Sequence, residues 1–356
     1  MLGQHGQVEL HVHLDGSFRP ETIFELARSK NIDLKVANVA ELKETLHIPL
    51  DSVASLAVFL DKFPIMIAPI VGDLKAIERV TNEFCEDIAS QGIIYCESRY
   101  SPHILASNES NKASGEQMTA RNVVIAISKV FEEAERRLDV KFRSILCCMR
   151  HLPELAEEVL ELCTEFRDKG VCGIDMAGHE NMIHVDPTPK EIIDVFREAH
   201  CRGINITVHA GESGEAANVA EAVDKMHAVR IGHGYHVIDD DALYKRLGTA
   251  RVHFEVCPCS SVVTGSTKPS RDDHPLKRFI EDGVDYSINS DDPTITGGGL
   301  SNDYSFVMER LGVTQQQIFQ SNLNATRAAF LPAAEKKALV SRLLKEYTSD
   351  GYQLDM

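Results

Sequence analysis

Two histidines and an aspartate near the start of the chain have the spacing of a metal-binding strand. His11 and His13 are two residues apart at the end of an alternating apolar run, and Asp15 follows them. Side chains at positions i and i+2 of a strand point to the same face, so the two imidazoles converge. Imidazole and carboxylate groups are ligands that zinc accepts. An HxH pair alone is a weak signal, because paired histidines also occur on solvated strand faces.

Three further apolar runs end in side chains of the same kinds. In chain order these are His209, Glu212, His233, Asp291 and Asp292. Three histidines and a carboxylate suit a divalent transition ion, above all zinc, with one position left for water. Glu212 lies close enough to a ligand to shuttle a proton, and His233 is suited to stabilise developing charge. The simpler alternatives are a loop histidine for His233 and a solvated turn carboxylate for Asp292.

The elements that position these residues alternate along the whole chain. Short apolar or β-branched runs lie near residues 7–14, 93–100, 140–148, 171–177, 204–210, 228–233, 252–257 and 284–289. Amphipathic patterns separate them, which predicts an α/β fold: a (β/α)8 TIM-type barrel whose active site gathers at the carboxyl ends of the strands. A doubly wound sheet is the alternative, but it favours a GxGxxG fingerprint, which the sequence lacks.

Two additions decorate this single predicted domain of residues 1–356. Residues 31–91 are predicted to form extra helices after strand one, and residues 300–347 three closing helices. Within the first addition, an apolar stripe has helical spacing. It consists of Leu56, Phe59, Leu60 and Phe63. The stripe either packs on the barrel wall or forms a lid over the barrel mouth, and both interpretations stay open.

Charge and cysteine usage narrow the class of protein. The net charge of -17 argues against sequence-independent binding to nucleic acid or an anionic membrane. The longest apolar stretch, 63–72, is too short to span a membrane. Nine cysteines, an odd number without disulfide-framework spacing, predict reduced thiols and a cytoplasmic protein. The Cys147-Cys148 and Cys257-Pro258-Cys259 groups are interpreted as core residues.

Seven motifs, taken together, resemble the adenosine deaminase family. They are HVHLDG at 11–16, SRYSPH at 98–103, SILCCMRH at 144–151, DMAG at 175–178, HAGE at 209–212, RIGHG at 230–234 and SDDP at 290–293. The similarity extends from about residue 7 to the Phe330-Leu331-Pro332 segment. No single motif is specific, but the combination is.

The resemblance implies a zinc-dependent hydrolytic deamination of adenosine and 2′-deoxyadenosine. One zinc ion per chain would be held by His11, His13, His209 and Asp291. Glu212 would protonate N1 of the purine, and His233 would assist attack at C6, with release of ammonia. For this role Glu212 has to be neutral in the loaded site, so its pKa should be raised by burial.

The resemblance also implies a set of contacts to a purine nucleoside. Asp15 and His13 would hold the ribose 5′-hydroxyl, the backbone of Gly178 would meet N3, and Asp292 would share a proton with N7. Leu56, Phe59 and Phe63 would form the apolar lid, and Ser260 and Ser261 would lie near the metal. Two residues, Cys259 and His179, depart from the family pattern. Both are expected near the mouth of the barrel, where they should alter substrate affinity or ligand specificity but not the chemistry.

Other activities remain alternatives. A nucleoside monophosphate deaminase would want cationic groups where Asp15 stands, although Gly297-Gly298-Gly299 could form a phosphate nest. A free-adenine deaminase would need no ribose contact. A two-metal amidohydrolase would need a lysine at the end of strand four, where this sequence has none. The cytidine deaminase class uses a PCxxC signature, and the Cys257-Pro258-Cys259 group lacks its second cysteine at that spacing. A non-catalytic binding protein would show damaged ligands. Protein partners and oligomeric state are left open.

Overall fold

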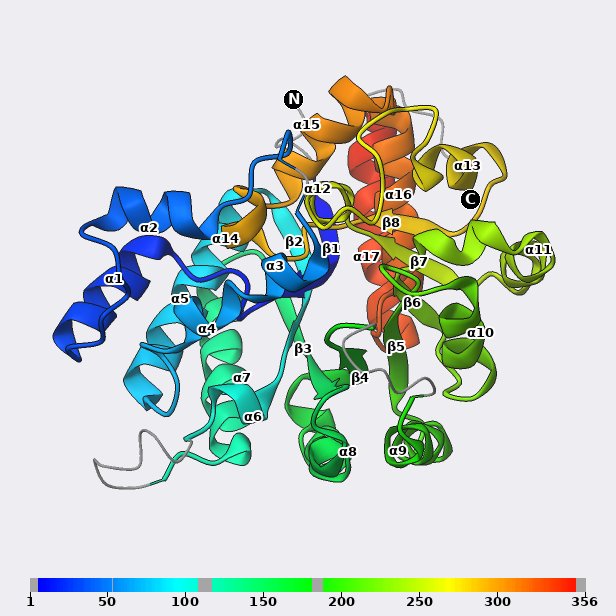
Figure 1. Ribbon diagram of the computed structural model, residues 1–356. Coiled ribbons are helices and arrows are strands. Elements are labelled where there is room, and N and C mark those ends of the chain that lie inside the picture. Colours follow the sequence, from blue (N-terminus) through cyan, green and yellow to red (C-terminus); the bar gives the residue numbers. More distant parts are fainter. Residues whose placement is uncertain (1–5, 53, 108–116, 181–187, 350–356) are drawn as a thin grey trace.

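Eight parallel strands form the centre of the computed structural model, which describes residues 6–52, 54–107, 117–180 and 188–349 (Figure 1). The strands are β1 (Gln7–His13), β2 (Ile93–Tyr100), β3 (Lys141–Met149), β4 (Val171–Ala177), β5 (Asn205–Ala210), β6 (Arg230–His233), β7 (His253–Val256) and β8 (Tyr286–Ile288). Each strand pairs in parallel with the next, in the order β1 to β8. All eight coincide with the predicted runs to within two residues at each end. The (β/α)8 barrel is confirmed.

Helices cover the outside of the strands (Figure 1). The longer connecting helices are α5 (Leu74–Ser90), α7 (Ala120–Arg137), α8 (Ala156–Glu165), α9 (Lys190–Cys201), α10 (Ala216–Asp224), α11 (Asp241–Ala250) and α13 (Pro275–Glu281). Short helices at the strand ends are α6 (Pro102–Leu105), η3 (Pro153–Leu155), η4 (Arg167–Lys169), η5 (Tyr235–Asp239), α12 (Pro258–Val263) and α14 (Pro293–Thr296). Helices α5 and α7 begin where Asp73 and Thr119 accept hydrogen bonds from backbone N–H groups of the first turn.

Additional helices lie between β1 and β2, and all but the first of them fall within the predicted insertion of residues 31–91. They are α1 (Pro20–Ser29), α2 (Val39–Leu46), α3 (Leu56–Leu60) and α4 (Phe63–Ile67). The last helix of the predicted insertion, α5, belongs instead to the regular outer layer. Its Phe84 ring lies 6.3 Å from Phe131 of α7 and 6.4 Å from Phe142 of β3, measured between ring centroids. The added part of this connection therefore ends before α5.

The apolar stripe spans two short helices rather than one. Helix α3 ends at Leu60 and α4 begins at Phe63, because Pro64 has no N–H with which to continue the helical hydrogen bonds. Leu56 and Phe59 are buried in the main hydrophobic core, with 7% and 2% of their surface exposed. Phe63 is half-buried. Two of the three predicted lid residues thus also serve as core residues.

The segment before the stripe is tied to the carboxyl-end loops of the barrel. Ala54 N–H donates to the carbonyl of Val263 in α12 at 2.8 Å, and Ile48 N–H donates to the carbonyl of Ile295 in α14 at 2.9 Å. Helices α12 and α14 directly follow β7 and β8. The insertion therefore lies at the end of the barrel where an active site is expected.

The barrel closes between β8 and β1 through one residue. Asp291 forms an isolated parallel bridge with Val12. Its N–H donates to the His11 carbonyl at 2.9 Å, and its carbonyl accepts from His13 N–H at 2.7 Å. Backbone pairing along this seam is short, so the predicted ligands on β1 and after β8 are held together by the closure itself.

Three helices end the chain, as predicted: α15 (Leu300–Arg310), α16 (Gln315–Ala328) and α17 (Ala333–Ser349). Helix α16 covers the seam. Its Asn322 side chain accepts from Val8 N–H of β1 at 2.7 Å, and its Ser321 hydroxyl accepts from Ile288 N–H of β8 at 2.9 Å. Side chains of α16 thereby satisfy strand groups that a longer β1–β8 ladder would otherwise pair.

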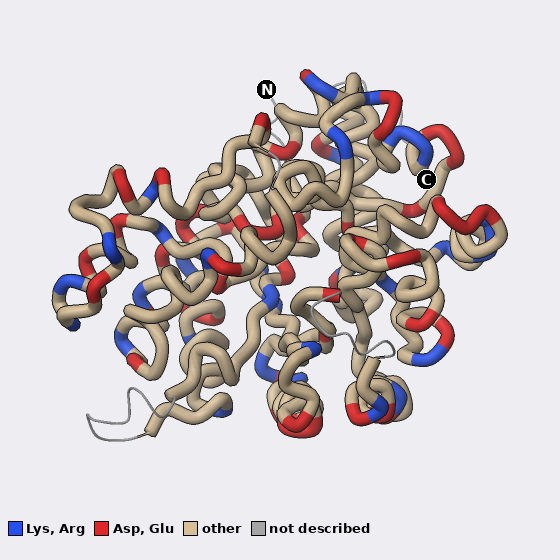
Figure 2. Tube along the Cα trace, viewed as in Figure 1, with Lys and Arg blue, Asp and Glu red and all other residues tan. Residues whose placement is uncertain are grey.

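Charged residues of both signs are interspersed over the outer helices (Figure 2). Among the described residues, no helix is long and apolar enough to cross a membrane. All nine cysteines are free thiols, and seven of them are buried. Cys259 follows β7 but is completely buried, and its N–H donates to Asp303 of α15 at 2.8 Å. This departure from the family pattern is thus enclosed in the core rather than exposed at the mouth.

Candidate active site

The four predicted metal ligands converge at the carboxyl end of the barrel. His11 and His13 come from β1, His209 from β5, and Asp291 from the closure after β8. One nitrogen or oxygen of each lies within 4.8 Å of those of the other three. Nε2 of His13 is 3.2 Å from Nε2 of His209, and Nε2 of His11 is 3.2 Å from Oδ1 of Asp291. This arrangement is a candidate metal centre.

Two buried carboxylates orient two of these imidazoles. Glu255 of β7 pairs with Nδ1 of His11 at 2.7 Å, and Asp175 of β4 pairs with Nδ1 of His209 at 2.9 Å. Metal-binding histidines commonly donate their second ring nitrogen in this way, which fixes the tautomer. Both Nε2 atoms are therefore left as acceptors facing the centre.

A single arginine connects these two carboxylates. Arg99 of β2 lies completely buried between them and donates to Asp175 at 3.0 Å and to Glu255 at 2.7 Å. Arg230 of β6 donates to the other oxygen of Glu255 at 2.6 Å. Burial would raise the pKa of Glu255, but the two guanidinium groups outweigh it and hold that pKa well below its usual range. The carboxylates beneath the site are therefore charged.

The chemistry of the ligand set fits a divalent transition ion. Nε2 of His11 is buried and makes no hydrogen bond, an arrangement that is costly unless a ligand completes it. Burial lowers the pKa of His209 to about 4, so its imidazole is neutral and ready to bind metal. His13 is also buried, but Asp292, Asp15 and Asp291 raise its pKa to about 9, so an ion has to displace its proton.

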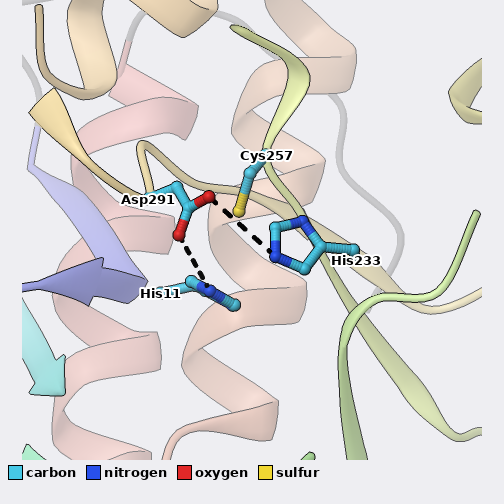
Figure 3. Close-up of side chains that lie close together, drawn as sticks. All are labelled: His11, His233, Cys257 and Asp291. Atoms are coloured by element: carbon cyan, nitrogen blue, oxygen red, sulfur yellow. Dashed lines mark ion pairs between the residues drawn. The ribbon is translucent and has the colours of Figure 1, made fainter. Parts of the chain in front are cut away.

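A second group of potential ligands shares two residues with the first. His11, His233, Cys257 and Asp291 also bring one ligand atom each within 4.8 Å (Figure 3). Nε2 of His233 is 3.9 Å from Oδ2 of Asp291, whereas His11 lies at the other oxygen of that carboxylate. The sequence interpretation of Cys257 as a plain core residue did not foresee this position beside the histidines.

His233 and Asp291 adopt backbone conformations that are uncommon in residues other than glycine. Both have positive φ angles, 64° for His233 and 61° for Asp291. Non-glycine residues in this left-handed region are uncommon, and they cluster at functional sites, where the surrounding structure over-determines them. The strain turns the two side chains at the ends of β6 and β8 toward the ligand cluster.

Glu212 lies next to the centre and holds its proton. Burial, followed by the charges of Asp291 and Glu180, raises the pKa of Glu212 well above its usual range. Its carboxyl lies 3.8 Å from Nε2 of His233, whose own pKa burial lowers well below normal. The pair therefore combines a neutral carboxylic acid with a neutral imidazole, which can give and take protons near neutral pH.

Asp292 is a second carboxyl that retains its proton. Burial, and then the neighbouring charge of Asp291, raises its pKa well above normal. One of its oxygens is buried without a hydrogen bond, as is Oδ1 of Asp15. Asp15 lies 3.7 Å from Nδ1 of His13. Gly178 follows β4 at this end of the barrel, with a positive φ of 99°. Every predicted polar substrate contact thus lies beside the ligand cluster or at the same end of the barrel.

Comparison with known proteins identifies the family. The adenosine deaminase family model matches residues 6–346. The chain belongs to the adenosine deaminase family. Adenosine deaminase of Rattus norvegicus is 43% identical over 346 residues, which cover 96% of this chain and 97% of the rat protein. Adenosine deaminase of Clostridium acetobutylicum is 32% identical and covers 95% and 96% of the two chains. Membership of this family makes the chain a hydrolytic deaminase.

Solved structures agree on the fold. Adenine deaminase from Arthrobacter aurescens superposes with a TM-score of 0.84 at 24% identity, over 97% of this chain and 99% of that one. Arabidopsis ADAL complexed with IMP superposes with a TM-score of 0.82 at 25% identity, over 99% of both chains. Both structures therefore share the overall fold of this chain over nearly its whole length.

Sequence reasoning missed the residues that support the site. Arg99 and Glu255 are charged residues inside strands whose other residues are mostly uncharged, and a charge inside a predicted strand was the available signal. Glu180 lies in the loop after Gly178, where a charged residue is ordinary, so its sequence position did not mark it as part of the site.

One cavity of the structure lies far from this chemistry. A cavity of about 950 Å³ is lined by the first residues of β3, β4 and β5, at the amino-terminal end of the strands, and no described histidine lines it. The catalytic centre is thus located by the ligand cluster and not by the size of a cavity.

Proposed function

We propose that this protein catalyses the zinc-dependent hydrolysis of adenosine and 2′-deoxyadenosine to inosine and 2′-deoxyinosine, with release of ammonia. The observation that carries the proposal is the buried cluster of three imidazoles and Asp291 beside a protonated Glu212. The relatives named adenosine deaminase, at 32 to 43% identity over nearly the whole chain, support the same activity.

The proposed zinc ligands are His11, His13, His209 and Asp291. A zinc ion in such a site lowers the pKa of a water molecule toward ~7 and so supplies the nucleophile. Glu255 and Asp175 hold two of the imidazoles in the required tautomer. The preference for zinc over other divalent ions rests on three nitrogen donors and one oxygen donor.

Two neighbouring groups would move the protons of the reaction. Glu212, neutral in its buried position, donates a hydrogen bond and then its proton to N1 of the purine, which makes C6 more electrophilic. His233, also neutral, accepts a proton from the attacking water and stabilises the charge that develops at C6. Asp291 serves both as a ligand and as the nearest anion to His233.

The remaining contacts would bind the nucleoside. Asp292 in its protonated form donates to N7, and the backbone at Gly178 meets N3. Asp15 and His13 hold the ribose 5′-hydroxyl, which suits the buried oxygen of Asp15 that has no hydrogen bond. The apolar residues Leu56, Phe59 and Phe63 cover the base. Because none of these contacts addresses the ribose 2′ position, both sugars should be accepted.

We further propose that residues 1–356 form one domain and that the protein acts in the cytoplasm on a small-molecule purine nucleoside. The nine free cysteines, seven of them buried, support a reducing compartment. Nucleic acid and membranes are not among the proposed partners, in keeping with the net charge of -17.

A nucleoside monophosphate is the second candidate substrate, since ADAL was solved with IMP. Two features of this chain disfavour it. Asp15 would place a carboxylate near the phosphate. Side chains of His47 and Gln91 pack closely against Gly297 and Gly299, which leaves little free space beside these glycines.

The test is the change in ultraviolet absorbance on mixing the protein with adenosine and, separately, with its 5′-monophosphate. Conversion of adenosine should be fast, and Glu212→Gln should lower kcat by roughly 10²- to 10⁴-fold. A matched surface variant, Glu309→Gln, should behave as wild type because Glu309 is exposed on α15. Conversion of the monophosphate in preference to adenosine would contradict the proposed substrate.

A further inference from the structure

One carboxylate outside the predicted site collects four consecutive backbone N–H groups. Oε1 of Glu180 accepts from Gly211 at 2.8 Å. Its Oε2 accepts from Glu212, Ser213 and Gly214, each at 2.9 Å. These four residues form the whole turn between the end of β5 and the start of α10 at Glu215. Glu180 itself comes from a different connection, the one after β4.

The turn depends on this contact for its shape. Gly211, Glu212 and Gly214 are buried, so their N–H groups need protein partners, because an unpaired buried N–H group destabilises the folded protein. Four N–H groups that converge on one point form an anion-binding concavity, and Glu180 fills it. Gly211 has a positive φ of 68°. At Gly214 a Cβ atom would lie 2.7 Å from Oε1 of Glu180, so the carboxylate sits where any larger residue would intrude.

The residue held at the centre of this turn is the proposed acid. We infer that Glu180 is a positioning residue for Glu212: it fixes the backbone from which that side chain reaches the purine. The inference rests on the proposed function, because it takes its meaning from the role of Glu212. A displacement of about 1 Å at such a group can cost 10²-fold in rate.

The charge of Glu180 also supports the proposed role of Glu212, because it helps to keep that carboxyl group protonated. After burial and Asp291, Glu180 makes the next contribution that keeps the pKa of Glu212 high. The charged or titratable groups that face Glu180 are Arg150, His179 and Glu212. Arg150 donates to the carbonyl of His209, so a second side chain holds the end of β5 just before the turn that Glu180 binds.

The first variant is Glu180→Gln. An amide has one acceptor oxygen, which can replace only one of the two carboxylate oxygens, and its NH2 group would face the N–H donor or donors bound by the other. The contact between residue 180 and the turn should therefore loosen although the size is unchanged. Hydrogen exchange in peptides covering residues 211–214 should accelerate. The value of kcat for adenosine should fall by roughly 10- to 100-fold with a smaller change in KM. The matched control is Glu191→Gln, an exposed carboxylate on α9, which should change neither measurement.

Two further variants separate positioning from general loss of structure. Gly214→Ala leaves the Glu180 carboxylate present but pushes it from its place, so it should reproduce both effects. In a Glu212→Gln background, adding Glu180→Gln should lower kcat no further, because the two residues act as one unit. Metal content should stay close to wild type and the variants should remain folded at the assay temperature, which a protein that lost the site through general unfolding would not show.

Unchanged exchange at residues 211–214 in Glu180→Gln would overturn the inference, and so would faster exchange with wild-type kcat. An additive loss in the double variant would overturn it as well. If the wild-type protein does not deaminate adenosine, the proposed function is wrong. The hydrogen-exchange measurement still tests whether Glu180 holds the turn at residues 211–214.

Discussion

Glu255 and His11 face each other at 2.7 Å inside the barrel, where neither side chain has any exposed surface. The contact joins β7 to β1 across the interior. It fixes which nitrogen of His11 faces the metal centre. Glu255 in turn is bonded to Arg99 and Arg230. The candidate metal centre thus rests on a buried ionic base that spans several strands.

Removing the charge of Glu255 should weaken metal binding. We expect Glu255→Gln to lower zinc affinity by about 10- to 100-fold, because the amide no longer fixes the tautomer of His11 as well. Zinc affinity is measured by competition with a chelator. It is calculated for the folded protein only, because breaking a buried ion pair also destabilises the fold. Glu281→Gln, exposed at the end of α13, is the control. Unchanged affinity would show that the tautomer of His11 is fixed elsewhere.

Metal removal should destabilise the folded protein. An ion at 1,000 times its Kd contributes about 4 kcal/mol to the free energy of unfolding. A strong chelator should therefore lower the thermal midpoint of the wild-type protein. In His11→Ala, which lacks one proposed ligand, the chelator should have much less effect. Equal shifts in both proteins would mean that the stabilising ion binds somewhere else.

Because its pKa is raised, Glu212 should lower the free energy of unfolding of the metal-free protein at high pH. The unfolded carboxyl releases its proton near pH 4.5, whereas the folded one keeps it, so the free energy of unfolding falls as pH rises above that value. Glu212→Gln should therefore be more stable than wild type at pH 8 and equal to it near pH 4. Denaturant unfolding of chelated samples at both pH values measures the difference. A variant less stable at pH 8 would contradict the assignment of a neutral Glu212.

The two phenylalanines of the insertion should separate core packing from substrate cover. Phe59 is 2% exposed, so Phe59→Ala should cost about 3–5 kcal/mol of stability through the cavity it leaves. Phe63 is half-buried, so Phe63→Ala should cost less stability and should mainly raise KM for adenosine. Denaturant unfolding and steady-state kinetics of both variants provide the test. A Phe63→Ala enzyme with wild-type KM would argue that this residue is part of the wall.

The strands, and the convergence of the candidate ligands at one end of the barrel, could be predicted from the amino-acid sequence. Apolar runs ending in histidine or aspartate mark both the strand and its carboxyl end, so pattern and spacing alone assign His11, His209 and Asp291 to one rim of the barrel. The seven motifs add the family. All of these features are local in the chain, which is why they can be recognised without knowledge of the tertiary contacts.

The support of the site could not be predicted in the same way. Glu180 meets residues 211–214 only because two neighbouring connections fold against each other, and nothing in its local sequence records that. The positive φ of Asp291 likewise follows from barrel closure rather than from its residue type. The break between α3 and α4 was foreseeable from Pro64, but the helical spacing of the apolar stripe obscured it.

The closure of the barrel at Asp291 has a consequence for the order in which the protein is made. During synthesis a chain that has emerged only through β7 already contains His11, His13 and His209, yet it lacks the residue that joins them to the seam. Helix α16, which covers that seam, is made later still. Because chains emerge amino terminus first, the complete four-ligand centre can form only near the end of translation. Binding of an ion at all four candidate ligands would therefore come late in the life of the nascent chain, and it would report that the first and last strands have met.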